Sequence, residues 1–430
     1  MDSTKQLQGH NARRRGWVVV FGGLGVNLAL GVLYSWGVFA SALRASGWTA
    51  TQSQVPYMIA CAVFALLMVP AGRLQDRLGP RLVLLVASVL TGAGFVLSSI
   101  FMTVGGLSLF YGVVFGSAMG FGYAATTPTA VKWFSPTHRG LISGIVVSGF
   151  GLAGIYVAPM KSLLIEHFGL EKTFLIIGIV LFSVIFLLRL IMDNPPAGYQ
   201  PDPLRSAPDP VKTGRTGRTG RTGRDFNWRE MMRTSQFYLL WSMFLFGTFA
   251  GLLILGQLSN IGQEQAGMTP GEATVIVVLY AVFNWLGRIF TGLISDRIGR
   301  KATLLIIFLI QTCSFLLFSQ LTTLMRLALG TALVAFSFGG MLASFPALTA
   351  DYFGLKNMGL NYGLIFTAWG VGGVLGPFLG GLVRDLTGTY RVSYMISAAI
   401  CLAGAVLSLM TRAPQKQDPA SDVSIQPEPA

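Results

Sequence analysis

One arginine lies inside an otherwise apolar stretch, and it is the residue of this chain best suited to chemistry. Arg288 stands eight residues before Asp296, which places it about 12 Å along a helix from the charged end of that stretch. This depth is too great for easy snorkelling, so we expect the side chain near the middle of a membrane, facing a cavity. A planar guanidinium matches a carboxylate. The pattern predicts a carboxylate-binding residue. The alternative is a structural arginine bonded to backbone carbonyls at a helix crossing.

Polar residues at helical spacing accompany Arg288, while Val, Leu and Ile occupy the opposite face of the same stretch. This arrangement is typical of a helix with one face toward a polar site and the other toward lipid. The polar face consists of Tyr280, Asn284, Arg288, Thr291 and Ser295.

The acidic residues are placed where they cannot pair with Arg288. All 17 Asp and Glu residues lie in loops, in tails or at the ends of apolar stretches. His10, His138 and His167 are equally peripheral. Arg288 therefore needs an anion from outside the protein. The same distribution argues against a proton relay through a dedicated buried carboxylate.

Patterns for catalysis or metal binding are missing from the sequence. Cys61, Cys313 and Cys401 fall inside apolar stretches without metal-ligand spacing. No nucleophile–base set or nucleotide-binding loop accompanies them. We expect neither an enzyme nor a bound cofactor or metal. The net charge of +14 is concentrated in loops between apolar stretches, so nucleic acid is not an expected partner.

The composition predicts an all-α membrane protein. Hydrophobic residues make up 53% of the chain and charged residues 11%. Apolar stretches of about 20 residues recur, each long enough to cross the hydrocarbon core of a lipid bilayer as a helix. We expect 12 transmembrane helices, near 17–40, 55–74, 82–103, 107–130, 140–165, 172–192, 236–260, 272–294, 302–321, 325–348, 359–383 and 391–411.

The chain repeats itself once. GRLQDRLGPR, from Gly72, recurs as GLISDRIGRK, from Gly292, at an offset of 220. WFSPTHRGLISG, from Trp133, and YFGLKNMGLNYG, from Tyr352, are related at an offset of 219. Two repeats in the same order are typical of a duplicated transporter with two six-helix bundles. We expect one bundle at 1–192, a basic linker at 193–235 that is a solvated tether or a regulatory segment, the second bundle at 236–411 and a tail at 412–430.

Lysine and arginine predict the orientation of the chain. The loops on the side of the N-terminus, the linker and the tail carry most of these residues, and the opposite loops carry few. By the positive-inside rule, both termini and the linker are cytoplasmic. Short loops on the other side, without Asn-x-Ser/Thr acceptors, favour a bacterial inner membrane.

Over its whole length the chain resembles the major facilitator superfamily, whose signature G-x-x-x-D-R-x-G-[RP]-[RK] matches both copies of the first repeat. Small residues at Gly72 and Gly292 permit close helix approach. The two aspartates can each face the N-terminus of a neighbouring helix, where the macrodipole favours a carboxylate. The resemblance implies a gate that breaks when the carrier rocks. Its expected residues are Asp76, Arg77, Arg81, Asp296, Arg297 and Arg300.

Within that superfamily, LGVLYSWGVF, WFSPTHRGLISG and NWLGRIFTGLISDRIGR resemble the oxalate/formate antiporter and monocarboxylate carrier branch. The resemblance implies that Arg288 contacts a substrate carboxylate. Asn284 stands where animal monocarboxylate carriers have Asp, and Trp369 stands where oxalate carriers have a second cation, Lys. A site with one cation suits one carboxylate on a small, partly apolar body such as lactate or pyruvate. The expected substrate-binding residues are Arg288, Tyr123, Asn284, Tyr34, Trp369, Tyr362, Phe338, Phe366, Phe150 and Leu342, of which Phe150 and Leu342 replace tyrosines of the oxalate pattern.

Several functions remain open at this level. The leading hypothesis is a secondary carrier for a small monocarboxylate, working by alternating access as a proton symporter or an anion exchanger. An oxalate/formate-type antiporter is one alternative. A drug efflux pump is another, although a lone cation without an acid fits it less well. A sensor that binds without transport is the third.

Overall fold

The computed structural model describes residues 2–48, 50–196, 199 and 225–414, and these are helical apart from turns and short connections. The N-terminal helices are α1 (Asp2–Leu30), α2 (Trp36–Ala45), α3 (Ala50–Leu78), α4 (Pro80–Ile100), α5 (Val104–Leu107), α6 (Gly116–Val131) and α7 (Arg139–Leu188). The C-terminal helices are α8 (Trp228–Met232), α9 (Ser235–Ala266), α10 (Pro270–Ile298), α11 (Arg300–Phe318), α12 (Leu324–Phe353), α13 (Met358–Thr387) and α14 (Arg391–Met410). Shorter segments are the 3₁₀ turns Gly31–Ser35 (η1) and Pro136–His138 (η3), and the π-helical segment Ser108–Phe115 (η2).

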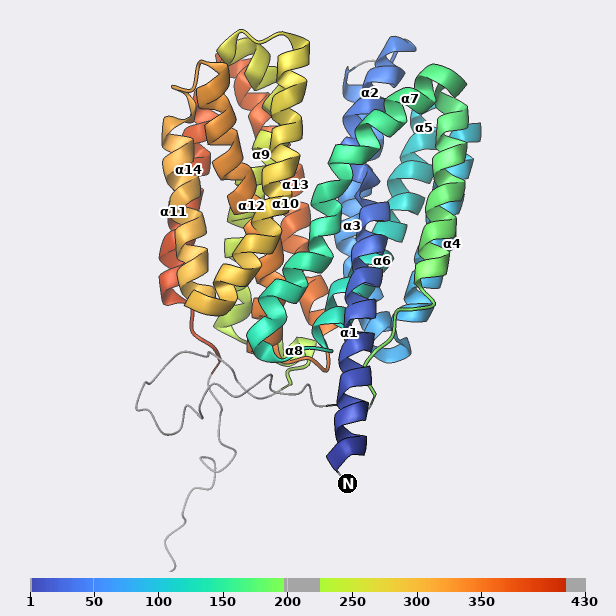
Figure 1. Ribbon diagram of the computed structural model, residues 1–430. Helices are drawn as coiled ribbons and strands as arrows, with labels where there is room; N and C mark the ends of the chain where they lie inside the picture. Colours follow the sequence, from blue (N-terminus) through green and yellow to red (C-terminus); the bar gives the residue numbers. More distant parts are fainter. Residues whose placement is uncertain (1, 49, 197–198, 200–224, 415–430) are drawn as a thin grey trace, which may run out of the picture.

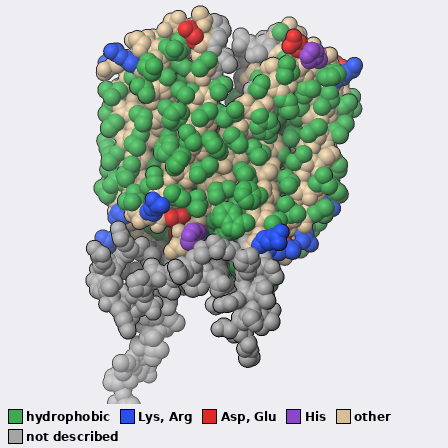
Figure 2. Space-filling model, viewed as in Figure 1, with side chains coloured by type: hydrophobic (Ala, Val, Ile, Leu, Met, Phe, Trp, Pro, Cys, Tyr) green, Lys and Arg blue, Asp and Glu red, His purple; other side chains and the backbone are tan. Residues whose placement is uncertain are grey.

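The outer surface is that of a membrane protein. In the described part of the chain, 12 segments are long and apolar enough to cross a bilayer, which confirms the expected number of spans. Large apolar side chains point outward; Leu66, Met325 and Leu386 are 63%, 70% and 76% exposed. Figure 2 shows this green belt between two rims that carry the charged side chains. Only lipid stabilises such a surface, so the chain is an integral membrane protein.

Several spans depart from a plain helix, and the fourth contains the π-helical segment η2. The first is interrupted by η1, so that α1 and α2 meet at a 3₁₀ turn. The expected fifth and sixth spans run as one element, α7, which reverses direction at Gly169, where φ is +78°. Glycine adopts that conformation without steric cost, which explains why the reversal occurs there. Within the expected linker, the short helix α8 begins with a capping box formed by Asn227 and Glu230.

The helices form two groups, α1–α7 and α9–α14, which lie side by side in Figure 1. The groups meet through α7 against α10 and through α3 against α13. In Figure 1 their ribbons converge at the end that carries the N-terminus and diverge toward the opposite end. We call the first end, which carries Arg15, Arg81 and Lys301, the N-terminal face. The boundaries at 192, 235 and 411 remain predictions.

Glycines of the repeated motifs make the two contacts between groups possible. A Cβ atom on Gly72 would lie 2.1 Å from the carbonyl oxygen of Gly359, and one on Gly292 would lie 2.3 Å from that of Gly140. Each copy of the first repeat therefore packs backbone to backbone on the second repeat of the other group. This crossed arrangement is close to symmetric.

Candidate functional site

Arg288 is buried where α10 meets α7. Its side chain is 1% exposed; Nε donates to Oδ1 of Asn284 at 3.0 Å, and Nη1 donates to the carbonyl oxygen of Val147. The second terminal nitrogen, Nη2, is buried and has no hydrogen-bond partner among the described residues. The structural role considered from sequence is thus partly realised, through Val147. One terminal nitrogen of the guanidinium nevertheless remains unpaired. A buried donor without an acceptor costs free energy unless a ligand supplies one.

Two glycines of α7 allow Arg288 to come this close. A Cβ atom on Gly144 would lie 2.3 Å from the carbonyl oxygen of Arg288, and one on Gly151 would lie 3.0 Å from Oδ1 of Asn284. The contact between the two groups and the placement of the cation therefore depend on the same small residues.

Aromatic rings from both groups form a continuous cluster beside the cation. The ring centroid of Tyr34 lies 6.0 Å from Cζ of Arg288 and 5.5 Å from the ring of Phe150. Phe150 lies 5.3 Å from Tyr123, and Tyr123 lies 5.2 Å from Phe366. Four of the predicted site residues are thus linked through ring contacts to Arg288. We call these four rings, together with Phe64 and Trp369, the aromatic cluster.

Phe64 of α3 lies at the centre of the aromatic cluster, and sequence reasoning did not identify it. Its ring lies 5.6 Å from Tyr123, 5.2 Å from Phe366 and 5.3 Å from Trp369. The repeat contained a usable signal, because Phe64 and Asn284 are equivalent at the offset of 220. At the same offset Met68 is equivalent to Arg288. The second half of the chain therefore has the amide–cation pair Asn284 and Arg288 where the first half has two apolar residues. The site is asymmetric.

The remaining predicted site residues are buried, but only some of them contact the aromatic cluster. Trp369 stacks on Phe366 at 5.1 Å, and its Nε1 is a buried donor without a partner among the described residues. Tyr362 lies 5.8 Å from Phe366. Phe338 packs instead on Gly251 of α9, whose carbonyl accepts a hydrogen bond from Tyr280. Leu342 is buried on α12, one turn from Phe338.

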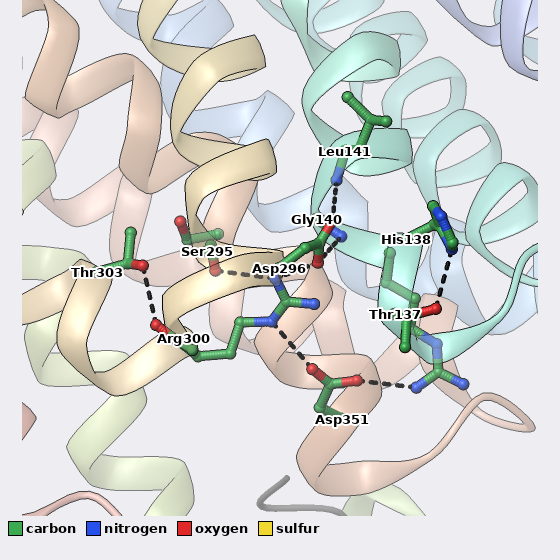
Figure 3. A network of polar contacts seen from close by, with 12 residues as sticks. Thr137, His138, Gly140, Leu141, Ser295, Asp296, Arg300, Thr303 and Asp351 are labelled. Carbon is green, nitrogen blue, oxygen red and sulfur yellow. Dashed lines mark hydrogen bonds and ion pairs between the residues drawn. The ribbon is translucent and has the colours of Figure 1, made fainter. Parts of the chain in front are cut away.

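The two aspartates of the repeated signature cap helices of the opposite group. Asp296 accepts hydrogen bonds from the backbone amides of Gly140 and Leu141 at 3.0 and 2.8 Å, at the start of α7 (Figure 3). Asp76 accepts equivalent bonds from Gly359 and Leu360 at 3.1 and 3.0 Å, at the start of α13. A carboxylate at a helix N-terminus satisfies free amides and interacts favourably with the macrodipole. These two carboxylate caps fasten the groups together at the N-terminal face.

Cations complete each cap. Lys132 lies 3.3 Å from Asp76, and Arg300 lies 2.7 Å from Asp296. Arg300 also reaches Asp351 at 3.0 Å (Figure 3). Arg139 of α7 donates to the same carboxylate at 3.0 Å. Asp351 therefore holds an arginine from each group. Sequence reasoning missed it because it lies outside the repeated signature.

Three arginines predicted for the gate lie elsewhere on this face. Arg81 donates to Asp193 at 3.0 Å and to the carbonyl of Met192, both within the N-terminal part of the chain. Arg77 and Arg297 are exposed. The part of these three residues in a gate stays a prediction, whereas Asp76, Asp296 and Arg300 take part in contacts that join the groups.

Comparison with known proteins decides the family. The model of the Major Facilitator Superfamily matches residues 17–269 and 254–427. The chain belongs to the Major Facilitator Superfamily. It is 33% identical over 369 residues to the uncharacterized MFS-type transporter YhjX of Escherichia coli, with 85% of this chain and 87% of that protein covered.

Two other relatives within the superfamily have names that state an anion. The oxalate:formate antiporter of Oxalobacter formigenes is 28% identical over 394 residues, covering 90% of each chain. Monocarboxylate transporter 13 of Bos taurus is 24% identical over 406 residues, covering 91% of this chain and 88% of that one. Both agree with the branch expected from the sequence motifs. The chain is accordingly a transporter and not an enzyme.

Solved structures of the superfamily share the fold. FucP in the outward conformation superimposes with a TM-score of 0.68 at 14% identity, over 93% of this chain and 100% of that one. The arrangement of 12 membrane helices is therefore that of the superfamily. Among the described residues no cluster of His, Cys, Asp or Glu could hold a metal ion.

Proposed function

We propose that this transporter carries a small monocarboxylate, such as lactate or pyruvate, across the membrane by alternating access. The observation that carries the proposal is the unpaired Nη2 of Arg288, buried beside aromatic rings contributed by both groups of helices. A carboxylate oxygen is the acceptor that best satisfies a guanidinium donor in a low-dielectric site. Because both groups contribute to the site, the substrate can bridge them while they rock.

The composition of the aromatic cluster supports one carboxylate over two. Trp369 and Phe64 are in contact within the aromatic cluster, and neither can neutralise a second negative charge. A dianion bound to Arg288 alone would leave a charge uncompensated in low dielectric. Indole and phenyl faces suit a short apolar body, and Nε1 of Trp369 offers one donor for a hydroxyl or keto oxygen. Oxalate/formate exchange is the second candidate function, because one relative is named as an oxalate:formate antiporter. A drug efflux pump has no specific support from this geometry.

The carboxylate caps supply the gate in this proposal. Asp76, Asp296 and Asp351 hold the groups together at the N-terminal face, and opening of that face requires their contacts to break. We assign this face, both termini and the linker to the cytoplasm because it carries most of the Lys and Arg residues. Exposed Arg77, Arg81 and Arg297 would then form new contacts in the state open to the cytoplasm. A bacterial inner membrane is the proposed location.

Uptake of labelled L-lactate into proteoliposomes tests the proposal. Empty vesicles with an inward proton gradient report proton symport, and vesicles preloaded with unlabelled lactate, formate or oxalate report exchange. Wild-type uptake should be saturable, and Arg288→Gln should abolish it while leaving membrane insertion unchanged. Arg288→Lys keeps the charge but loses the fork, so its uptake should be intermediate.

Arg189→Gln is the matched control. This arginine follows the last residue of α7, and its guanidinium stacks on Phe186 at 4.3 Å, away from the proposed site. The variant should transport like wild type. Full lactate uptake by Arg288→Gln would remove the proposed site, and preference for oxalate over lactate would favour the antiporter candidate.

A further inference from the structure

A second buried cation lies in the N-terminal group, and the proposed transport site does not use it. Lys161 of α7 is 0% exposed and lies eight residues before Gly169, where α7 reverses direction. It forms no ion pair with a carboxylate among the described residues. A lysine in the membrane is costly and marks a functional position by default. The sequence contained the signal, since Lys161 falls inside the expected span 140–165.

The ammonium group of Lys161 is matched by three acceptors. Nζ donates to the carbonyl oxygens of Val32 and Ser35 at 3.1 and 3.2 Å, and it lies 4.0 Å from the ring centroid of Phe39. An ammonium has three donors and no acceptor, so two carbonyls and one aromatic face use all of its N–H groups. Two carbonyl oxygens and one aromatic face therefore surround the amino group of Lys161.

Both carbonyls belong to η1, the 3₁₀ turn that interrupts the first span. Turns of this type have weaker internal hydrogen bonds than an α-helix, and a 3₁₀ stretch within a helix often marks a hinge. Here the turn is closed by Trp36, whose amide donates to the carbonyl of Leu33, and by the hydroxyl of Ser35, which donates to Val32 at 2.9 Å. Lys161 adds hydrogen bonds to two further carbonyls of the same turn, those of Val32 and Ser35.

Tyr34 lies within that turn and faces the transport site. Its ring contacts Phe150 and lies 6.0 Å from Cζ of Arg288, while the neighbouring carbonyl of Ser35 is held by Lys161. Tyr34 and Ser35 are neighbours in the chain, so a change in the conformation of the turn moves Tyr34. Gly31 fixes the other end against α7, because a Cβ atom there would lie 2.3 Å from Cβ of Ala153.

We propose that Lys161 is a positioning residue for anion binding: it holds the 3₁₀ turn of the first span so that Tyr34 stands beside Arg288. Lys161 does not touch the anion. Its effect on transport is transmitted through Tyr34. The role of Tyr34 in binding rests on the proposed function, whereas the hold of Lys161 on the turn does not.

Two readouts separate these claims. The first is hydrogen–deuterium exchange of residues 28–39 in the full-length protein in lipid nanodiscs, which needs no substrate. In Lys161→Met, exchange of the amides at 31–36 should accelerate about tenfold, because two hydrogen bonds that hold the turn are lost. The matched control is Tyr156→Phe, which removes a bond from α7 to α1 instead, from the tyrosine hydroxyl to the carbonyl of Leu28 at 2.8 Å. Exchange at 31–36 should stay as in wild type in that control.

The second readout is KM for L-lactate uptake in a double-mutant cycle with Tyr34→Ala. Lys161→Met should raise KM about tenfold in the wild-type background and leave it unchanged when Tyr34 is already absent. Lys161→Arg keeps donors for both carbonyls and should recover most of the loss. If Lys161→Met does not accumulate in the membrane, Lys161→Leu, which also lacks a donor, serves in both assays.

The outcomes differ clearly. Unchanged exchange at 31–36 overturns the proposal, whatever happens to transport. Faster exchange with an undiminished KM effect in the Tyr34→Ala background also overturns it, because Lys161 would then act on the anion without Tyr34. Faster exchange in a protein whose wild type takes up no lactate, formate or oxalate supports the hold on the turn and rejects the proposed function alone.

Discussion

Asp296 accepts a hydrogen bond from the backbone amide of Gly140 at 3.0 Å, although the two residues belong to different groups of helices. The same relationship recurs between Asp76 and Gly359 at 3.1 Å. In both cases the carboxylate at the end of one helix replaces the missing hydrogen-bond acceptor at the start of another. The signature glycine next to each contact, Gly292 or Gly72, lets the two backbones come close enough. The repeated motif is thus a joint between the groups, and its strength depends on a negative charge.

Asp296→Asn should weaken this joint by about 1–2 kcal/mol, because the amide loses the charge that interacts with the helix start and with Arg300. Spin labels at Leu78 and Ile298, two exposed and repeat-equivalent positions, report the separation of the groups at the N-terminal face. Pulsed electron paramagnetic resonance should show a larger share of long distances in the variant. Glu264→Gln, which breaks an exposed ion pair with Arg384, is the control. An unchanged distance distribution in Asp296→Asn would argue against a gating role.

Gly144→Ala should impair both stability and transport. The new methyl group would lie 2.3 Å from the carbonyl oxygen of Arg288, so α10 must move away from α7. Overpacking of this kind costs about 1–3 kcal/mol, and here it also displaces the cation of the site. We expect a lower thermal unfolding midpoint and at least tenfold slower lactate uptake. Gly105→Ala is the control, since its methyl group meets no heavy atom within 4 Å. Wild-type transport by Gly144→Ala would show that the close contact is not needed.

The membrane fold and the burial of Arg288 could be predicted from the sequence, because both follow from the distribution of apolar and charged residues along the chain. Hydropathy specifies the spans, and a single charge in an apolar stretch identifies Arg288. The repeat also anticipated that each signature aspartate would face a helix start. It could not show that the partner of Asp296 lies in the other group, because that pairing is set by how the two groups pack.

Other parts of the site were not accessible from the same patterns. Phe64 is one phenylalanine among 30, and its central place in the aromatic cluster depends on packing between α3 and α13. Phe338 has the same residue type, yet it packs on Gly251 of α9. Lys161 was detectable as a charge within a span, but its meaning comes from a 3₁₀ turn that hydropathy does not predict.

Trp369→Lys should shift selectivity toward dianions. The substitution places a second cation beside Phe64 and Phe366, where it can neutralise the second carboxylate of oxalate. We expect the ratio of oxalate to lactate uptake to rise at least tenfold. Trp369→Phe controls for the lost indole volume and should leave the ratio near that of wild type. A stable Trp369→Lys protein that still prefers lactate would place the substrate away from Trp369.

Asn284→Asp tests whether Arg288 is free to bind an external anion. Nε of Arg288 already donates to the side-chain oxygen of Asn284 at 3.0 Å, so the new carboxylate would form an internal ion pair without rearrangement. That pair competes with the substrate, and lactate uptake at pH 7 should fall at least tenfold. Protonation of the introduced carboxylate removes the competition, so uptake should recover as the pH is lowered, and transport becomes acid-activated.

The matched control for that variant is Asn260→Asp, which adds the same charge at an exposed position of α9. Its pH profile should follow that of wild type. Because Asn284→Asp introduces the only carboxylate next to Arg288 among the described residues, acid activation confined to this variant would assign the effect to that pair. Undiminished uptake by Asn284→Asp at neutral pH would mean that the substrate carboxylate binds elsewhere, and that the unpaired nitrogen of Arg288 is not its anchor.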